Sequence, residues 1–152
     1  MRMMIAVTML ALAGCTQSEP PETATPGPMP HARGDQLSPV PAFKGGGEHW
    51  SIDITSTGRG AHDTSLVWAD GSQRSAFKLF YKGQPADAPS TLIVLSGEMR
   101  ARGALQPVIV EIKRESCRNG AGDSFMHSVS VTAEGLEPGI SPLRGCGHLA
   151  MR

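Results

Sequence analysis

The sequence lacks several features that would indicate a function directly. Its 152 residues carry 14 Lys or Arg and 14 Asp or Glu, so the formal net charge is zero. This balance argues against a nucleic-acid binder, which normally carries a basic excess or stripe. Aromatic residues make up only 5%, whereas 18 Gly and 12 Pro are typical of a loop-rich β protein with a Pro-rich linker. No Gly-x-Ser-x-Gly nucleophile elbow is present, and no other catalytic motif stands out.

The N-terminus is typical of a secretory signal peptide. Arg2 supplies a positive charge, and the apolar run from Ile5 to Leu12 is interrupted only by Thr8. This run is shorter than the roughly 20 residues that a membrane-spanning helix needs. An ordinary cleaved signal peptide and a buried N-terminal helix are the alternatives. We expect a lipoprotein signal peptide over residues 1–14.

The end of the apolar run, Leu12-Ala13-Gly14-Cys15, resembles the lipobox of bacterial lipoproteins. The resemblance implies cleavage before Cys15 and its modification with fatty acids such as palmitate. The lipid would be the protein's contact with the membrane. Thr16 stands where Asp would signal retention in the inner membrane, so the resemblance implies an outer-membrane lipoprotein that faces the periplasm.

The remaining cysteines, Cys117 and Cys146, form an even pair if Cys15 is lipidated. In an oxidising compartment such a pair favours a disulfide. The alternative is a metal site that adds His127 and His148, although the usual Cys-x2-Cys spacing of structural zinc sites is absent. We therefore expect a disulfide, no metal and no cofactor.

Composition divides the mature chain into a linker and one domain. Residues 15–47 are rich in Pro, Ser, Thr and Gly, a composition that cannot bury enough apolar surface to fold. We expect a disordered linker there and a folded domain over residues 48–152. Apolar alternation and turn residues predict strands at 50–55, 66–68, 73–81, 92–95, 98–102, 107–113, 126–131 and 143–148. About eight short strands without a helix predict an all-β domain, either a small antiparallel barrel or a sandwich.

The segment Gly47-Glu48-His49-Trp50, followed by an Ile-rich strand, resembles the opening of small bacterial lipoproteins of the HslJ/META and membrane-bound lysozyme inhibitor type. A cysteine after a strand and a closing Leu143-Arg144-Gly145-Cys146 complete the resemblance, which covers residues 47–148. Many such lipoproteins are uncharacterised. The resemblance implies a small disulfide-containing β-barrel and does not imply a substrate.

The candidate site residues are few. Ser124, His127 and Asp123 have the chemistry of a catalytic triad, but they lie too close along one segment to suggest one. Carboxylate pairs such as Glu48 with Asp53, or Glu111 with Glu115, have no sign of burial. We therefore predict no catalytic residue. We expect the loop after Cys117 to bind a partner, through Arg118, Asn119, Asp123 and Ser124, with residues 83–88 as a second candidate loop.

Basic residues gather in two places, which could contact acidic glycans, anionic lipid or an acidic protein. These are Arg100 with Arg102, and Lys113 with Arg114 and Arg118. We expect a lipid-anchored, non-enzymatic binding module, in its sharper form an inhibitor or immunity protein against a lysozyme-like, peptidoglycan-cutting enzyme. Cell-wall glycan is the other expected partner. The alternative is a metal-handling or envelope-stress lipoprotein of structural role.

Overall fold

A computed structural model describes residues 37–136 and 139–150 of the chain. The expected signal peptide, the lipidation site Cys15 and most of the expected linker lie outside the described residues. The described residues form these strands: β1 (Ala42–Gly47), β2 (Trp50–Ser56), β3 (Ala61–Trp68), β4 (Gln73–Tyr81), β5 (Leu92–Ala101), β6 (Ala104–Arg118), β7 (Ser124–Ala133) and β8 (Leu143–Leu149). No helix in this part of the chain is long and apolar enough to cross a bilayer.

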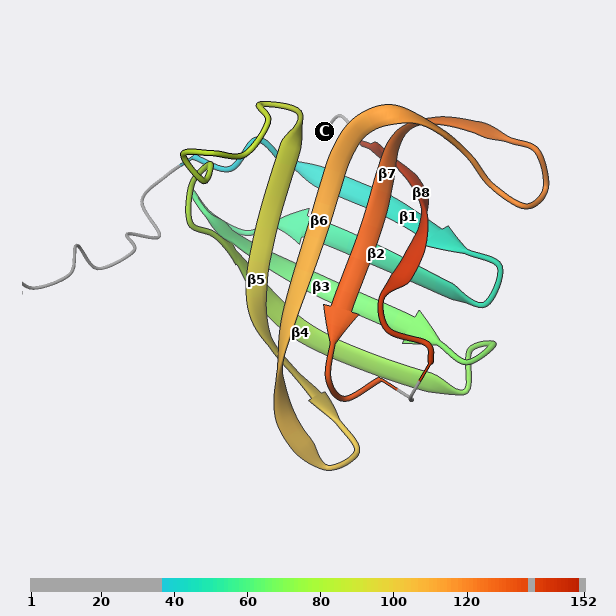
Figure 1. Ribbon diagram of the computed structural model, residues 1–152. Coiled ribbons are helices and arrows are strands. Elements are labelled where there is room, and N and C mark those ends of the chain that lie inside the picture. The colour runs from blue at the N-terminus through green and yellow to red at the C-terminus, as the bar shows by residue number, and fades with distance from the viewer. Residues whose placement is uncertain (1–36, 137–138, 151–152) are drawn as a thin grey trace, which may run out of the picture. The chain divides into compact units, whose positions relative to one another are not determined.

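The eight described strands form a closed antiparallel barrel, which confirms the all-β prediction and decides between the barrel and the sandwich that the sequence left open. Each strand pairs with its neighbour in the chain, and β1 pairs with β8 to close the circle. In Figure 1, β1 to β4 run across the picture behind the steeper β5, β6 and β7, so the barrel is flattened into two crossing layers. Closure leaves no free sheet edge along the barrel, which removes a route to edge-to-edge aggregation.

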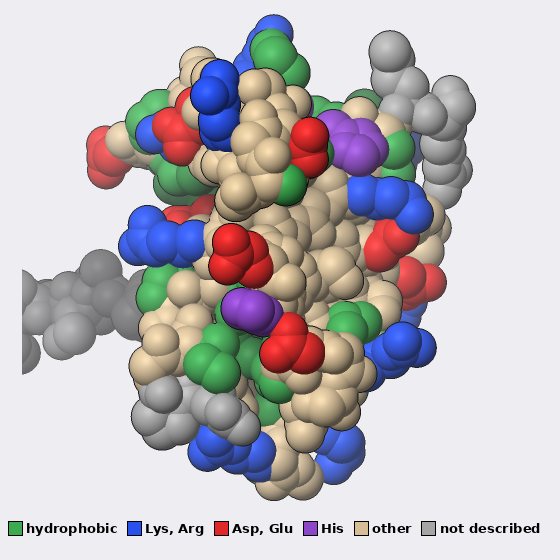
Figure 2. All heavy atoms as spheres, turned by 90° about the vertical axis from the view of Figure 1, so that its right-hand side faces the viewer, with side chains coloured by type: hydrophobic (Ala, Val, Ile, Leu, Met, Phe, Trp, Pro, Cys, Tyr) green, Lys and Arg blue, Asp and Glu red, His purple; other side chains and the backbone are tan. Residues whose placement is uncertain are grey.

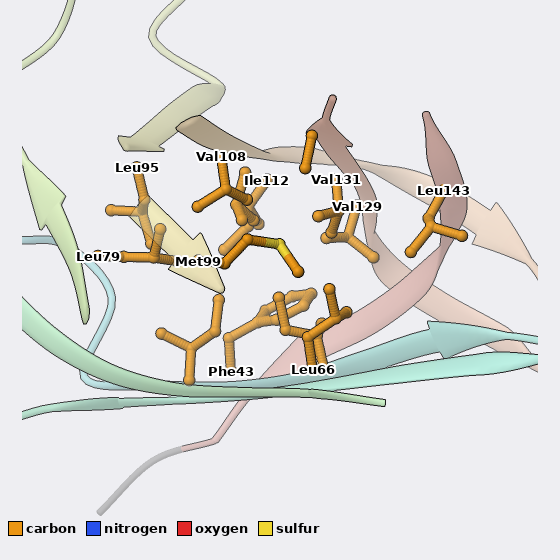
Figure 3. Close-up of a cluster of buried hydrophobic side chains, with 14 of the residues drawn as sticks. Phe43, Leu66, Leu79, Leu95, Met99, Val108, Ile112, Val129, Val131 and Leu143 are labelled. Atoms are coloured by element: carbon orange, nitrogen blue, oxygen red, sulfur yellow. The ribbon is translucent and has the colours of Figure 1, made fainter. Parts of the chain in front are cut away.

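The core lies between these two layers. Alternate residues of each strand point inward, so in β2 the side chains of Trp50, Ile52 and Ile54 are buried while those of Ser51 and Thr55 are exposed. Apolar side chains from both layers point toward one another in Figure 3, among them Phe43, Leu66, Leu79, Leu95, Met99, Val108, Ile112, Val129, Val131 and Leu143. Burying these side chains is the main stabilisation of the barrel.

The barrel begins earlier in the chain than the sequence suggested. Residues 42–47 were expected to end the linker, but they form β1, which pairs with both β2 and β8. Phe43 is fully buried, and so is Val40 just before the strand. The three glycines that follow Phe43 concealed the strand, because they show no alternation of apolar and polar side chains. Their small size is needed here, since a Cβ on Gly46 would lie 2.4 Å from the backbone oxygen of Trp50.

Strand lengths also differ from expectation. Ser96-Gly97 was expected to separate two strands, but β5 runs through both residues to Ala101. Gly97 permits close packing rather than a turn, because a Cβ there would lie 2.1 Å from the carbonyl oxygen of Lys78 in β4. The expected hairpin at Asp70-Gly71 is confirmed between β3 and β4. Asp70 has a φ of 54° and Gly71 a φ of 86°, as a tight turn requires.

Cys117 and Cys146 form a disulfide, as expected, with their Cα atoms 5.6 Å apart. The bond joins β6 to β8, the two strands that flank β7. Every ladder of the barrel, the described core and the disulfide lie within residues 37–150. This segment therefore has all the parts of an independently folding domain.

Candidate functional site

The β6–β7 hairpin extends over one end of the barrel (Figure 1), and a disulfide attaches it to β8. Arg118 and Ser124 are the last paired residues of its two strands, so they close the hairpin rather than belonging to a loop as expected. The loop itself consists of residues 119–123. A shift in register between Arg114 and Cys117 marks a β-bulge in β6. Bulges bend a strand and increase its twist, which lets this hairpin curl away from the barrel wall.

The hairpin loop is ordered by its own hydrogen bonds. The backbone N–H of Asp123 donates to Oδ1 of Asn119 over 2.8 Å, and Nδ2 of Asn119 donates to Oδ2 of Asp123 over 3.0 Å. The backbone N–H of Asn119 donates to the carbonyl oxygen of Asp123, also over 3.0 Å. Gly122 has a φ of 89°, a conformation that favours glycine. The loop therefore presents a defined shape.

The disulfide fastens this hairpin to β8, next to the turn between β1 and β2. The hairpin lies beside this turn. The two are so close that a Cβ on Gly120 would lie 2.3 Å from Oε1 of Glu48. Figure 1 shows the hairpin extending over the right-hand end of the barrel, where the β1–β2 turn also lies. Together these elements line a groove that is open to solvent and has a volume of about 970 Å³. Its walls come from the outer face of β6 and β7, from β8, and from the β1–β2 turn.

Polar contacts fix the side chains on the strand wall of the groove. Nζ of Lys113 lies 2.6 Å from Oε2 of Glu115, and Oγ of Ser128 donates to Oε1 of Glu115 over 2.6 Å. The bonds from Lys113 and from Ser128 lower the pKa of Glu115. A carboxylate stabilised in this way is a weak base, so it is poorly suited to activate Ser128 as a nucleophile. The cluster is better suited to present fixed charges to a partner.

A second polar pair lines another part of the groove and joins the β1–β2 turn to the β3–β4 turn. Nδ1 of His49 lies 2.6 Å from Oδ1 of Asp70, and Nε2 lies 3.9 Å from Oε2 of Glu48. The hydrogen bond to Asp70 and the charge of Asp70 raise the pKa of His49. Figure 2, which looks at the hairpin end of the barrel, shows acidic and basic side chains interspersed rather than separated by sign. Sequence reasoning missed this pair, because nothing in the sequence places His49 beside Asp70.

The triad residues are not brought together. Asp123 is bonded to Asn119, and no hydrogen bond among the described residues joins Ser124, His127 and Asp123. The ring of His127 instead packs edge-on against Phe43, with centroids 6.4 Å apart. Of the expected carboxylate pairs, Asp53 pairs with Lys44 over 2.7 Å rather than with Glu48. Glu111 and Glu115 both line the groove, where Glu115 pairs with Lys113.

The alternative metal site of Cys117, Cys146, His127 and His148 is wrong, because both of its cysteines are joined in the disulfide. No group of three or more His, Cys, Asp or Glu side chains within residues 37–136 and 139–150 is placed to hold a metal ion. The basic cluster expected near Cys117 is divided as well. Arg118 lines the groove, whereas Arg114 lines a different cavity.

A scan against protein-family models, a search of curated proteins and a search of solved structures each found no match to this chain. The functional argument therefore rests on the residues of the chain itself.

Proposed function

We propose that this protein is a lipid-anchored, non-enzymatic binding module of the bacterial cell envelope, in the outer membrane and facing the periplasm. Its partner is a lysozyme-like, peptidoglycan-cutting enzyme, which it inhibits. The observation that carries the proposal is the β6–β7 hairpin, a loop ordered by Asn119 and Asp123 and fastened to the barrel by the disulfide. A rigid projecting loop loses little conformational entropy when it enters a cleft, and this favours tight binding.

Two further features support the proposal. The disulfide fits an oxidising compartment outside the cytoplasm. The sequence Leu12-Ala13-Gly14-Cys15 supplies an anchor at the N-terminal end of the chain, and residues 16–36 supply a tether between the anchor and the barrel. The lipobox resemblance and the resemblance to small bacterial lipoproteins, a group that includes lysozyme inhibitors, point to the same location.

The anchor is tested by Cys15→Ser in the full chain expressed in a Gram-negative host. We expect the lipidated protein in the membrane fraction and the variant outside it. An unchanged distribution would contradict lipid anchoring.

The inhibitor role is tested by shortening the hairpin. Residues 119–123 are replaced by Asn-Gly, a two-residue turn that keeps the pairing of Arg118 with Ser124 and keeps the disulfide. We expect the unaltered domain to slow peptidoglycan digestion by a purified lysozyme, and we expect the shortened domain to lose at least tenfold in potency. Arg102→Asn is the matched control, because it alters the β5–β6 turn, outside the groove.

Equal potency of the shortened and unaltered domains would remove the hairpin from the binding site. Absence of inhibition by the unaltered domain, combined with binding of peptidoglycan fragments, would replace the enzyme partner with a cell-wall glycan. The side chains of Arg118 and Arg144, which line the groove, would then be the expected contacts with acidic groups of the glycan.

A further inference from the structure

A second cavity lies where the chain enters the barrel. It has a volume of about 770 Å³, within the range of small-molecule sites, and Pro39 lies on its wall just before β1. It shares no lining residue with the groove beside the β6–β7 hairpin. A ligand bound here would therefore leave the hairpin groove free.

The charged side chain that lines this cavity is positive. Arg114 lines it, and no described lining residue is Asp or Glu. None of the ion pairs or side-chain hydrogen bonds of the described residues involves the Arg114 guanidinium, since the neighbouring Glu115 pairs with Lys113 instead. An exposed guanidinium without a partner is ready to accept a planar anion in a bidentate geometry.

His127 faces Arg114 directly across the β6–β7 ladder and contributes a second polar group. Its Nδ1 is buried and has no hydrogen-bond partner. A protonated, charged ring would leave a buried donor unsatisfied, so the neutral ring with its proton on Nε2 is favoured. Burial, Arg114 and His148 also lower the pKa of His127, which agrees with a neutral ring. Nε2–H is thus left to donate to a ligand.

The rest of the lining combines the polar residues Gln84, Ser90 and Thr91 with a larger apolar and aromatic part. Ile93 and Leu149 are partly buried in the wall, Tyr81 is buried, and Met126 is 65% exposed at the rim. An unbranched apolar chain could cover Met126 and these side chains and so remove apolar surface from water. Methionine adapts well to such contacts because its side chain is flexible and polarizable.

We propose that this cavity binds a single-chain amphiphile with a carboxylate head, such as a medium-chain fatty acid. The carboxylate pairs with Arg114 and accepts a hydrogen bond from Nε2 of His127. The alkyl chain lies against Ile93, Met126 and Leu149. Arg114, with no Asp or Glu among the described lining residues, selects an anion, and the apolar side chains of the wall select a chain over a small free anion.

The test titrates decanoate, below its micelle concentration, into residues 16–152 and follows the heat of binding. We expect saturable binding of one decanoate per chain. We expect Arg114→Gln to weaken binding at least tenfold and Met126→Glu to abolish it, because a second carboxylate at the rim repels the head and interrupts the apolar wall. Both side chains are exposed, so both variants should keep the thermal midpoint of the parent.

Arg74→Gln is the matched control, because it removes an exposed arginine from β4, outside the cavity, and we expect it to bind decanoate as the parent does. Decyltrimethylammonium has the same chain with a cationic head, and we expect it to bind at least tenfold more weakly. The proposal is overturned if the parent does not bind decanoate, if Arg114→Gln binds equally well, or if the two head groups bind alike. Since the groove is separate, none of these outcomes bears on lysozyme inhibition.

Discussion

At the scale of single residues, Arg102 is held in a backbone conformation that it does not favour. Arg102 has a φ of 51° and Gly103 a φ of 81°, in a two-residue turn between the paired residues Ala101 and Ala104. Hairpin turns of this kind favour Asn-Gly, because Asn tolerates the left-handed region better than residues with longer side chains. We expect Arg102→Asn to raise the free energy of unfolding by about 0.5 kcal/mol.

Urea denaturation measures this change. Arg74→Asn makes the same substitution at the second residue of β4, which pairs with Val67 in β3; Asn is disfavoured in a strand, so this variant should lower stability. If the free energy of unfolding changed in the same direction in both variants, the strained turn at Arg102 would not explain the result.

The buried His62 makes stability depend on pH. Nε2 lies 3.1 Å from the carbonyl oxygen of Val40, the side chain is 0% exposed, and Nδ1 has no partner. Burial lowers the pKa of His62 below its ordinary value of 6.5. Below about pH 6.5 the unfolded chain therefore takes up a proton that the folded barrel does not.

Stability should consequently be complete above pH 6.5 and fall over the more acidic interval below that value, with a slope of at most about 1.4 kcal/mol per pH unit from this group. His62→Gln cannot titrate, so its unfolding free energy should depend less on pH over this interval. Urea denaturation at a series of pH values provides the measurement. Equal slopes for parent and variant would rule out His62 as the cause.

At the scale of elements, the pairing of β1 with β8 depends on glycine. A Cβ on Gly145 would lie 2.0 Å from the carbonyl oxygen of Gly46, which is rigid backbone. We expect Gly145→Ala to separate the two strands and to destabilise the barrel by about 3 kcal/mol, the upper part of the range for overpacking. Gly58→Ala is the matched control, because a Cβ there meets no atom within 4 Å. If the thermal midpoint fell equally in both variants, close packing between β1 and β8 would not be the reason for the loss of stability.

The disulfide stabilises the barrel and holds the β6–β7 hairpin in place. It joins residues 29 positions apart, so the chain-entropy model predicts a loss of about 3.5 kcal/mol when it is removed. We expect the double variant Cys117→Ser and Cys146→Ser to unfold at lower denaturant concentration and to become more sensitive to proteolysis within residues 118–124. A variant as stable and as protease-resistant as the parent would argue against a fastening role.

Most elements could be predicted from the sequence wherever side chains alternate. Ile52 and Ile54 indicated β2, Val129 and Val131 indicated β7, and counting cysteines indicated the disulfide. The β1 strand could not be predicted because Gly45, Gly46 and Gly47 have no side chains to alternate. The groove could not be predicted either, because it depends on strand register and on the bulge that turns the hairpin toward Glu48.

At the scale of the whole molecule, the core and the proposed binding groove share a few residues, because Trp50, Val129 and Leu143 are buried in the core and also line the groove. The core is built from alternating apolar residues of all eight described strands, and the disulfide adds a constraint that the core does not supply. The two surfaces for which we propose binding roles, the hairpin groove and the cavity at the chain entrance, share no lining residue, and residues 119–123 contribute no side chain to the core. The hairpin can therefore be shortened without removing a core residue, which makes the proposed function testable in a folded protein.

The most direct test of the binding role uses residues 16–152, produced in an oxidising periplasm and immobilised through the C-terminus. Purified lysozyme-like enzymes and peptidoglycan fragments are passed over this protein and over the hairpin-shortened variant. We predict that the parent retains one enzyme at a ratio of one to one and that the shortened variant does not. Retention of neither enzyme nor glycan by the parent, or equal retention by both proteins, would contradict a binding module that acts through the β6–β7 hairpin.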